Sequence, residues 1–78
     1  MRVTVELQAY LDKYSPDGQH VFSHELPDGA TVQALLRQLS LPEAMAGVII
    51  LNGASGDFSD ALADGDRVIL IPPLQGGR

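Results

Sequence analysis

The sequence predicts an α+β domain of two layers, in which one face of a sheet is covered by one main helix. Three patterns indicate this class. Apolar and polar residues alternate at the start of the chain, a single apolar stripe at helical spacing follows, and two apolar runs rich in β-branched residues occupy the second half. Their order is hairpin, helix and then two more strands.

The first hairpin is predicted from the alternation of apolar and polar residues over residues 2–8, which is typical of a half-buried strand. Residues 15–18, Ser-Pro-Asp-Gly, form a turn because proline presets φ and glycine accepts positive φ. The second strand follows over roughly residues 20–26, and Pro-Asp-Gly at residues 27–29 closes the hairpin.

One main helix is expected after the hairpin. Thr31 stands at the N-cap position, where its hydroxyl oxygen can accept a hydrogen bond from a free N–H group of the first turn. The apolar residues that follow recur at i, i+3, i+4 and i+7 and therefore share one face: Val32, Leu35, Leu36 and Leu39. Pro42 ends this pattern, and the stripe requires cover from a sheet.

Two further strands complete the predicted sheet. Residues 48–51, Val-Ile-Ile-Leu, are typical of a strand buried on both faces, so we expect this strand to be central, with Asn-Gly at residues 52–53 turning the chain after it. Residues 67–71 form the last strand, because Pro72 and Pro73 lack the N–H donors that further pairing needs. We therefore divide the chain into a globular domain, residues 1–71, and a flexible C-terminal diglycine tail, residues 72–78.

Composition excludes several classes of function. The chain has 78 residues and no cysteine, which indicates one domain without disulfides, thiolate metal sites or a cysteine nucleophile. With a net charge of -5 and five scattered basic residues, it lacks a basic patch for nucleic acid. No apolar run is long enough for a signal peptide or a membrane span, so we expect no membrane partner and a cytoplasmic protein.

Two clusters of titratable residues have simple interpretations. His20 and His24 would lie roughly 13 Å apart on one strand, too far to share a metal, so both are assigned to the strand surface and no metal site is expected. Four acidic residues lie shortly before the tail: Asp57, Asp60, Asp64 and Asp66. They form either a solvated face of turn residues or a negative surface that steers a basic partner.

The last seven residues are the main functional signal. They place a diglycine, Gly76-Gly77, beyond the last strand, and a segment without side chains can enter a narrow cleft of an enzyme. Residues 72–77 span up to about 20 Å when extended. Pro72-Pro73 should stiffen the start of this arm and hold it off its own sheet, which lowers the entropy cost of insertion.

The ending of the chain resembles that of a known family. Residues 62–77 contain a leucine, Asp-Gly-Asp, an apolar strand, Pro-Pro and a diglycine in that order. This ending is similar to that of the β-grasp, ubiquitin-like sulfur carriers, the family of the molybdopterin-synthase small subunit and the thiamin-biosynthesis sulfur carrier. The resemblance covers essentially the whole domain and implies a mixed sheet of four to five strands covered on one face by one main helix.

The resemblance also implies a reaction at Gly77. In this family an E1-like enzyme uses ATP to adenylate the C-terminal carboxylate, sulfur displaces AMP, and the thiocarboxylate donates its sulfur in a sulfur-accepting synthase. The carrier would then bind no cofactor and have no catalytic residue of its own. Arg78 departs from the pattern by masking the Gly77 carboxylate, so we expect a peptidase, such as a JAB-type metallopeptidase, to remove it. The alternative is that Arg78 is foreign to the natural protein.

The resemblance specifies the docking residues and the pathway less fully than the reaction at Gly77. Ile69 and Ile71 share one face of the last strand, and Ile71 matches a partner-facing position. Leu74, beside Gln75 on the arm, is expected to enter a pocket of the partner, and packing back onto the sheet is the alternative. Gln8 replaces an aromatic residue that family members often use for partner contact. Pro-Pro favours the molybdopterin branch over the thiamin branch, but carriers for cysteine, homocysteine, tungsten cofactor and tRNA thiolation have similar tails. A ubiquitin-like modifier conjugated through Gly77 to lysines and a β-grasp interaction module are the alternative functions.

Overall fold

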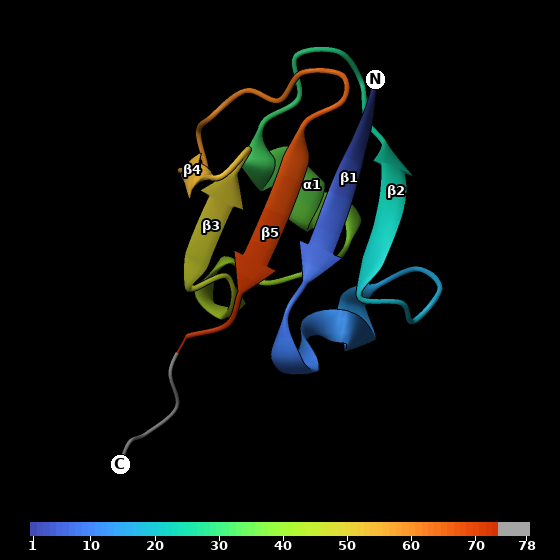
Figure 1. Cartoon of the computed structure of the whole chain (residues 1–78), viewed down its shortest axis with the longest axis vertical. Coiled ribbons are helices and arrows are strands. Elements are labelled where there is room, and N and C mark those ends of the chain that lie inside the picture. Colours follow the sequence, from blue (N-terminus) through green and yellow to red (C-terminus); the bar gives the residue numbers. More distant parts are fainter. Residues whose placement is uncertain (74–78) are drawn as a thin grey trace.

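The protein folds as a five-stranded sheet with one α-helix across one of its faces (Figure 1). The computed structural model describes residues 1–73. The strands lie in the order β2-β1-β5-β3-β4. Element bounds are Arg2–Leu7 for β1, Val21–Glu25 for β2, Val32–Gln38 for α1, Val48–Leu51 for β3, Ala54–Ser55 for β4 and Arg67–Ile71 for β5. Two short 3-10 helices add to these, η1 at Ala9–Tyr14 and η2 at Glu43–Met45.

The sheet is mixed, because the first and last strands run parallel to each other at its centre. β1 pairs with β5 in parallel, from Thr4 opposite Arg67 to Leu7 opposite Leu70, while β1–β2, β3–β5 and β3–β4 are antiparallel. The predicted first hairpin, the α+β class and the end of sheet pairing at Ile71 are confirmed.

The prediction that residues 48–51 form the central, doubly buried strand is wrong. β5 is the middle strand of the five, and β3 lies between it and the two-residue β4. Ile49 is 6% exposed, whereas Val48 on the other face is 45% exposed. The reason is that α1 covers only one face, so a continuous apolar run does not require burial on both faces.

The helix begins as the sequence predicts. The Thr31 hydroxyl accepts a hydrogen bond from the backbone N–H of Ala34 at 3.2 Å. The first two N–H groups of the helix donate to carbonyl oxygens of the loop between β4 and β5. The N–H of Val32 donates to Asp60 at 3.0 Å, and that of Gln33 donates to Phe58 at 2.9 Å. The helix ends at Gln38, before the predicted stop at Pro42, because Ser40 turns the chain with φ of 57°.

The core lies between α1 and the inner face of the sheet. Val32, Leu35 and Leu36 of the helix are at most 1% exposed, and Val68 and Leu70 of β5 are fully buried. Met45 and Phe58 are partly buried and pack against this core. Among residues 1–73 no polar side chain is buried, and no helix is long and apolar enough to cross a membrane.

Three short segments differ from the sequence-based prediction. The connection between β1 and β2 contains η1, whose Leu11 is fully buried, and β4 is a short strand at residues to which the sequence assigned no element. Both are too short for a periodic signal to identify them. His20 precedes β2, which begins at Val21, so its assignment to the strand is wrong.

Candidate functional site

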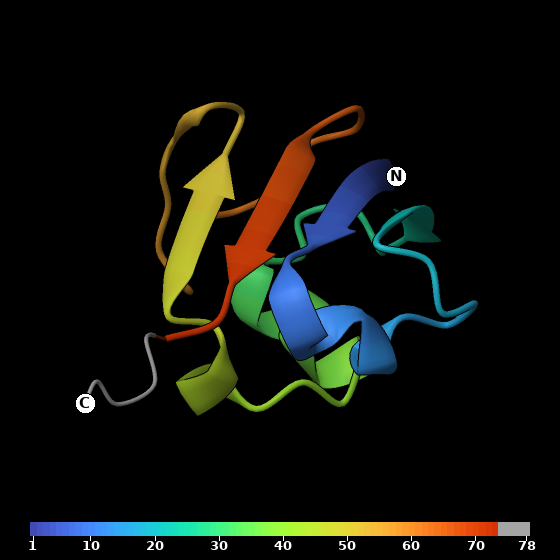
Figure 2. The same cartoon turned by 60° about the horizontal axis from the view of Figure 1, so that its bottom comes forward.

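The candidate site lies where the chain leaves the sheet after β5. Because β1 and β5 are parallel, both end at this edge of the sheet, and Pro72 and Pro73 follow β5 there (Figures 1 and 2). Pro72 and Pro73 are half-buried. The predicted site residues Leu74, Gln75, Gly76, Gly77 and Arg78 lie outside the described residues, so their roles stay predictions.

The first two residues of the predicted tail lie against the domain. A Cβ atom built on Gly47, which joins η2 to β3, would be 2.7 Å from both the N and Cα atoms of Pro73. Such an approach is possible only because Gly47 has no side chain. The sequence carried no signal for this contact, since Gly47 and Pro73 belong to segments far apart in the chain.

Beside the tail lies an open apolar strip, formed by Val48, Ile50, Ile69 and Ile71. Ile71 is opposite Val48 and Ile69 is opposite Ile50 in the β3–β5 ladder, so the four side chains share the sheet face that α1 does not cover. Three of them are half-buried and Val48 is exposed. The predicted division of β5, with Ile69 and Ile71 on one face and Val68 and Leu70 on the other, is confirmed.

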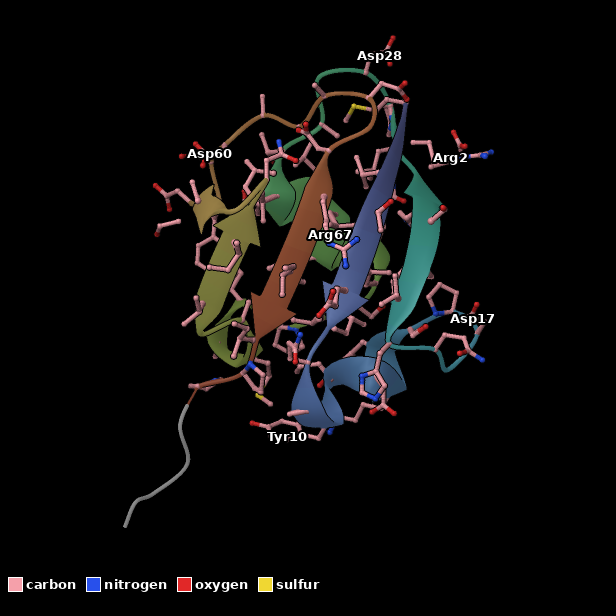
Figure 3. All side chains as sticks on the ribbon, in the orientation of Figure 1. Arg2, Tyr10, Asp17, Asp28, Asp60 and Arg67 are labelled. Carbon is pink, nitrogen blue, oxygen red and sulfur yellow. The ribbon has the colours of Figure 1, made fainter. Side chains whose placement is uncertain are left out.

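Polar residues border the open apolar strip on the β1 side. Arg67 Nη2 donates to Glu6 Oε1 at 2.6 Å, and the amide of Gln8 also donates to the Glu6 carboxylate. Arg67 stands out from the middle of this face in Figure 3. Its side chain is 51% exposed, so the ion pair is solvated and adds little to stability.

The acidic residues lie at the N-terminal end of β5, opposite the tail. Their carboxylates accept hydrogen bonds that stabilise the loop between β4 and β5. Asp66 accepts hydrogen bonds from the backbone N–H of Ala63 and the side-chain amide of Asn52, while Asp64 accepts from the backbone N–H of Arg2. Asp60 accepts from the backbone N–H of Asp57. These bonds support the interpretation as turn residues, and they place the carboxylates at the opposite end of the strand from the tail.

The two histidines make separate contacts. His20 Nδ1 lies 2.6 Å from the carbonyl oxygen of Leu7, and His24 Nε2 lies 2.8 Å from Gln38 Oε1. In residues 1–73 no three histidine or acidic side chains form a group that could hold a metal ion. A titration shift occurs at Asp17, where hydrogen bonds from the Gln19 N–H and the Ser15 hydroxyl lower the pKa of the carboxyl group.

Comparisons with solved structures place this arrangement among ubiquitin-like β-grasp proteins. The Haloferax volcanii HVO 2177 protein has 26% identity and a TM-score of 0.81, over 99% of this chain and 87% of that chain. A putative molybdopterin converting factor subunit 1 from Pyrococcus furiosus has 27% identity and a TM-score of 0.75, over 95% of this chain and 99% of that chain. SAMP1 from Haloferax volcanii, at 22% identity and a TM-score of 0.74 over 99% and 100%, supports the fold.

A further structural match comes from a complex. The protein-protein complex of subunits 1 and 2 of molybdopterin-converting factor from Helicobacter pylori contains a chain with 29% identity and a TM-score of 0.60, over 99% of this chain and 100% of that chain. No curated protein sequence matches this chain. The model of the ThiS family matches residues 10–77, from η1 to the diglycine. Since this match covers most of the chain, the chain belongs to the ThiS family, whose members are ubiquitin-like sulfur carriers with a β-grasp fold.

Proposed function

We propose that this protein carries sulfur as a thiocarboxylate on Gly77 and delivers it to a synthase, after removal of Arg78. The observation that carries the proposal is the extent of the ThiS family match, which runs through the diglycine and ends at Gly77. The fold is consistent with the same role, because β5 ends at Ile71 and Pro72-Pro73 follow it at the end of the sheet where β1 also ends.

The proposed chemistry takes place in three steps. A peptidase, such as a JAB-type metallopeptidase, hydrolyses the Gly77–Arg78 peptide bond and frees the carboxylate. That carboxylate then attacks the α-phosphorus of ATP in an E1-like enzyme, which gives an acyl adenylate and releases pyrophosphate. A hydrosulfide ion next attacks the acyl carbon, the bond from carbon to the AMP oxygen breaks, and AMP leaves behind a thiocarboxylate.

The protein supplies a docking surface and a reactive terminus, while ATP belongs to the activating enzyme. The open apolar strip lies directly beside Pro72, so a partner that covers the strip also meets the start of the tail. Apolar area of this kind is a common centre of a protein interface. The Helicobacter pylori complex of two molybdopterin-converting factor subunits supports a synthase as the sulfur acceptor.

Charging of defined chain lengths tests the proposal. A chain that ends at Gly77 is mixed with ATP and the E1-like enzymes of its host, and exchange of labelled pyrophosphate into ATP is measured. We expect exchange with this chain and none with the full chain ending at Arg78. When hydrosulfide is added, the mass of the protein should rise by the exchange of one oxygen atom for one sulfur atom.

Three outcomes separate the alternatives. No exchange by the chain ending at Gly77 with any host adenylating enzyme would contradict the proposal. Exchange that leads to isopeptide links with substrate lysines, and to no thiocarboxylate, would select the ubiquitin-like modifier. Full cellular activity after deletion of Gly76 and Gly77 would select a β-grasp interaction module.

A further inference from the structure

Gly47 is the described glycine that approaches the tail most closely. A Cβ atom on this residue would lie 2.7 Å from Pro73 N, 2.7 Å from Pro73 Cα and 3.1 Å from the carbonyl carbon of Pro72. Its φ is not in the left-handed region, whereas Gly18, Gly29, Gly53 and Gly65 have positive φ and no atom within 4 Å of a built Cβ. Gly47 is therefore required for space and not for backbone conformation.

The segments on both sides of this contact are held in place. Ala46 is 5% exposed and belongs to the core, and Val48 is paired with Ile71 in the β3–β5 ladder. Continuing that antiparallel register by one residue places Gly47 opposite Pro72. The atoms that face Gly47 are backbone atoms of two prolines with restricted φ, so no side-chain rotation can relieve a clash.

We propose that Gly47 is a positioning residue that sets the course of Pro72 and Pro73, the residues that lead from β5 into the tail. The missing side chain lets Pro72 and Pro73 lie directly on the segment between η2 and β3, a course that Figure 2 shows. The start of the tail is thus oriented by a contact with the domain and not by the stiffness of the prolines alone. The consequence for sulfur transfer rests on the proposed function, whereas the contact itself does not.

The expected effect follows from the size of one methyl group. Carbon atoms in contact lie about 3.5–4.0 Å apart, so an alanine at this position must displace Pro73 by roughly 1 Å. A misplacement of about 1 Å can lower the rate of a positioned reaction roughly 100-fold. Gly47 is not one of the four residues of the open apolar strip, so we expect binding of the domain to the activating enzyme to change little.

The kinetic test compares Gly47→Ala with Gly56→Ala in the chain ending at Gly77. A Cβ on Gly56 would also be crowded, but by side-chain atoms of Ile49 and Leu51 at 3.1 and 3.2 Å, remote from the tail. For Gly47→Ala we expect kcat for adenylation to fall about 10- to 100-fold with KM within about twofold of the unsubstituted chain. For Gly56→Ala we expect kcat to be unchanged. Unchanged kcat in Gly47→Ala would overturn the proposal.

A structural test gives an answer independent of charging. Nuclear Overhauser contacts between the α-protons of Gly47 and the ring protons of Pro73 are measured in the full chain, with contacts across the Val48–Ile71 pair as the internal reference. We expect both sets in the unsubstituted protein and weakening of the first set alone in Gly47→Ala. Absence of the Gly47–Pro73 contacts from the unsubstituted protein would overturn this proposal, whereas failure of all charging would overturn only the proposed function.

Discussion

Asn52 joins the β3–β4 turn to the first residue of β5. Its φ is 52°, and Gly53 follows with φ of 84°, as the Asn-Gly dipeptide predicted for a tight turn. Its side-chain oxygen accepts from the Arg67 N–H at 2.9 Å, and its amide donates to Asp66 at 2.9 Å. The left-handed conformation was predictable from two neighbouring residues. The two hydrogen bonds were not, because they depend on a strand that begins 15 residues later.

Substitution of Asn52 should separate these two contributions. Asn52→Gly keeps the access to positive φ and loses both side-chain bonds, so we expect a loss of about 1 kcal/mol in the free energy of unfolding. Asn52→Ala adds left-handed strain, for a total loss of about 2 kcal/mol. Urea denaturation with a common m-value checks this order. An alanine variant as stable as the glycine variant would contradict it.

The lowered pKa of Asp17 predicts how the free energy of unfolding changes at acid pH. Because its pKa is lowered in the folded state, the unfolded chain binds the proton more readily, and the stabilisation is present above the ordinary pKa of 3.8 and lost as the pH falls through the folded-state value. The difference in unfolding free energy between the unsubstituted protein and Asp17→Asn should therefore shrink between about pH 5 and pH 2. Denaturant titrations across this range measure the difference. A constant difference would argue against the Gln19 and Ser15 bonds as its source.

At the scale of elements, the two faces of β5 have different roles, one in the core and one in the open apolar strip. Val68 and Leu70 point into the core and are fully buried, whereas Ile69 and Ile71 form half of the open apolar strip. This alternation follows from the strand period of two and was predicted from the sequence. The other half of the strip, Val48 and Ile50, became visible only through the register between β3 and β5.

Charge on the open apolar strip should weaken docking without unfolding the protein. For Ile71→Lys in the chain ending at Gly77 we expect KM for adenylation to rise about tenfold or more, with kcat within about threefold, because an interface loses apolar area and gains a charge. Val21→Lys is the matched control, since Val21 lies on the same sheet face opposite Glu6 in β1 and is 48% exposed. Equal KM values for the two variants would contradict a docking role for the strip.

At the scale of the whole molecule, the first and the last strand of the sheet pair with each other. β1 and β5 are neighbours at the centre of the sheet, and both pack on α1 through the same core. A domain of this size has a free energy of unfolding of roughly 4–12 kcal/mol. The strand that leads into the tail should therefore lose its order in one cooperative transition with the helix.

Truncation of one buried side chain of α1 should test whether the helix and the sheet unfold together. Leu35→Ala deletes a fully buried side chain between α1 and the sheet, so we expect a loss of about 3 kcal/mol in unfolding free energy and the same transition by helix and sheet signals. Arg37→Ala, at an exposed position of the same helix, should change it by less than about 0.5 kcal/mol. Circular dichroism and amide exchange in urea measure both. Separate transitions for helix and sheet would contradict a single cooperative unit.

The sequence by itself determined the features that depend on near neighbours. These features follow from residues within one turn or one strand: the cap at Thr31, the turn at Asn52-Gly53, the two faces of β5 and the end of this strand before Pro72. The ordered ending up to Gly77 likewise identified the family. The tertiary structure alone decided that β5 and not β3 is central, that Val48 and Ile50 complete the open apolar strip, and that Gly47 meets Pro73. These features depend on the pairing of segments far apart in the chain, and the register of that pairing is set by burial of the whole core and not by any local pattern.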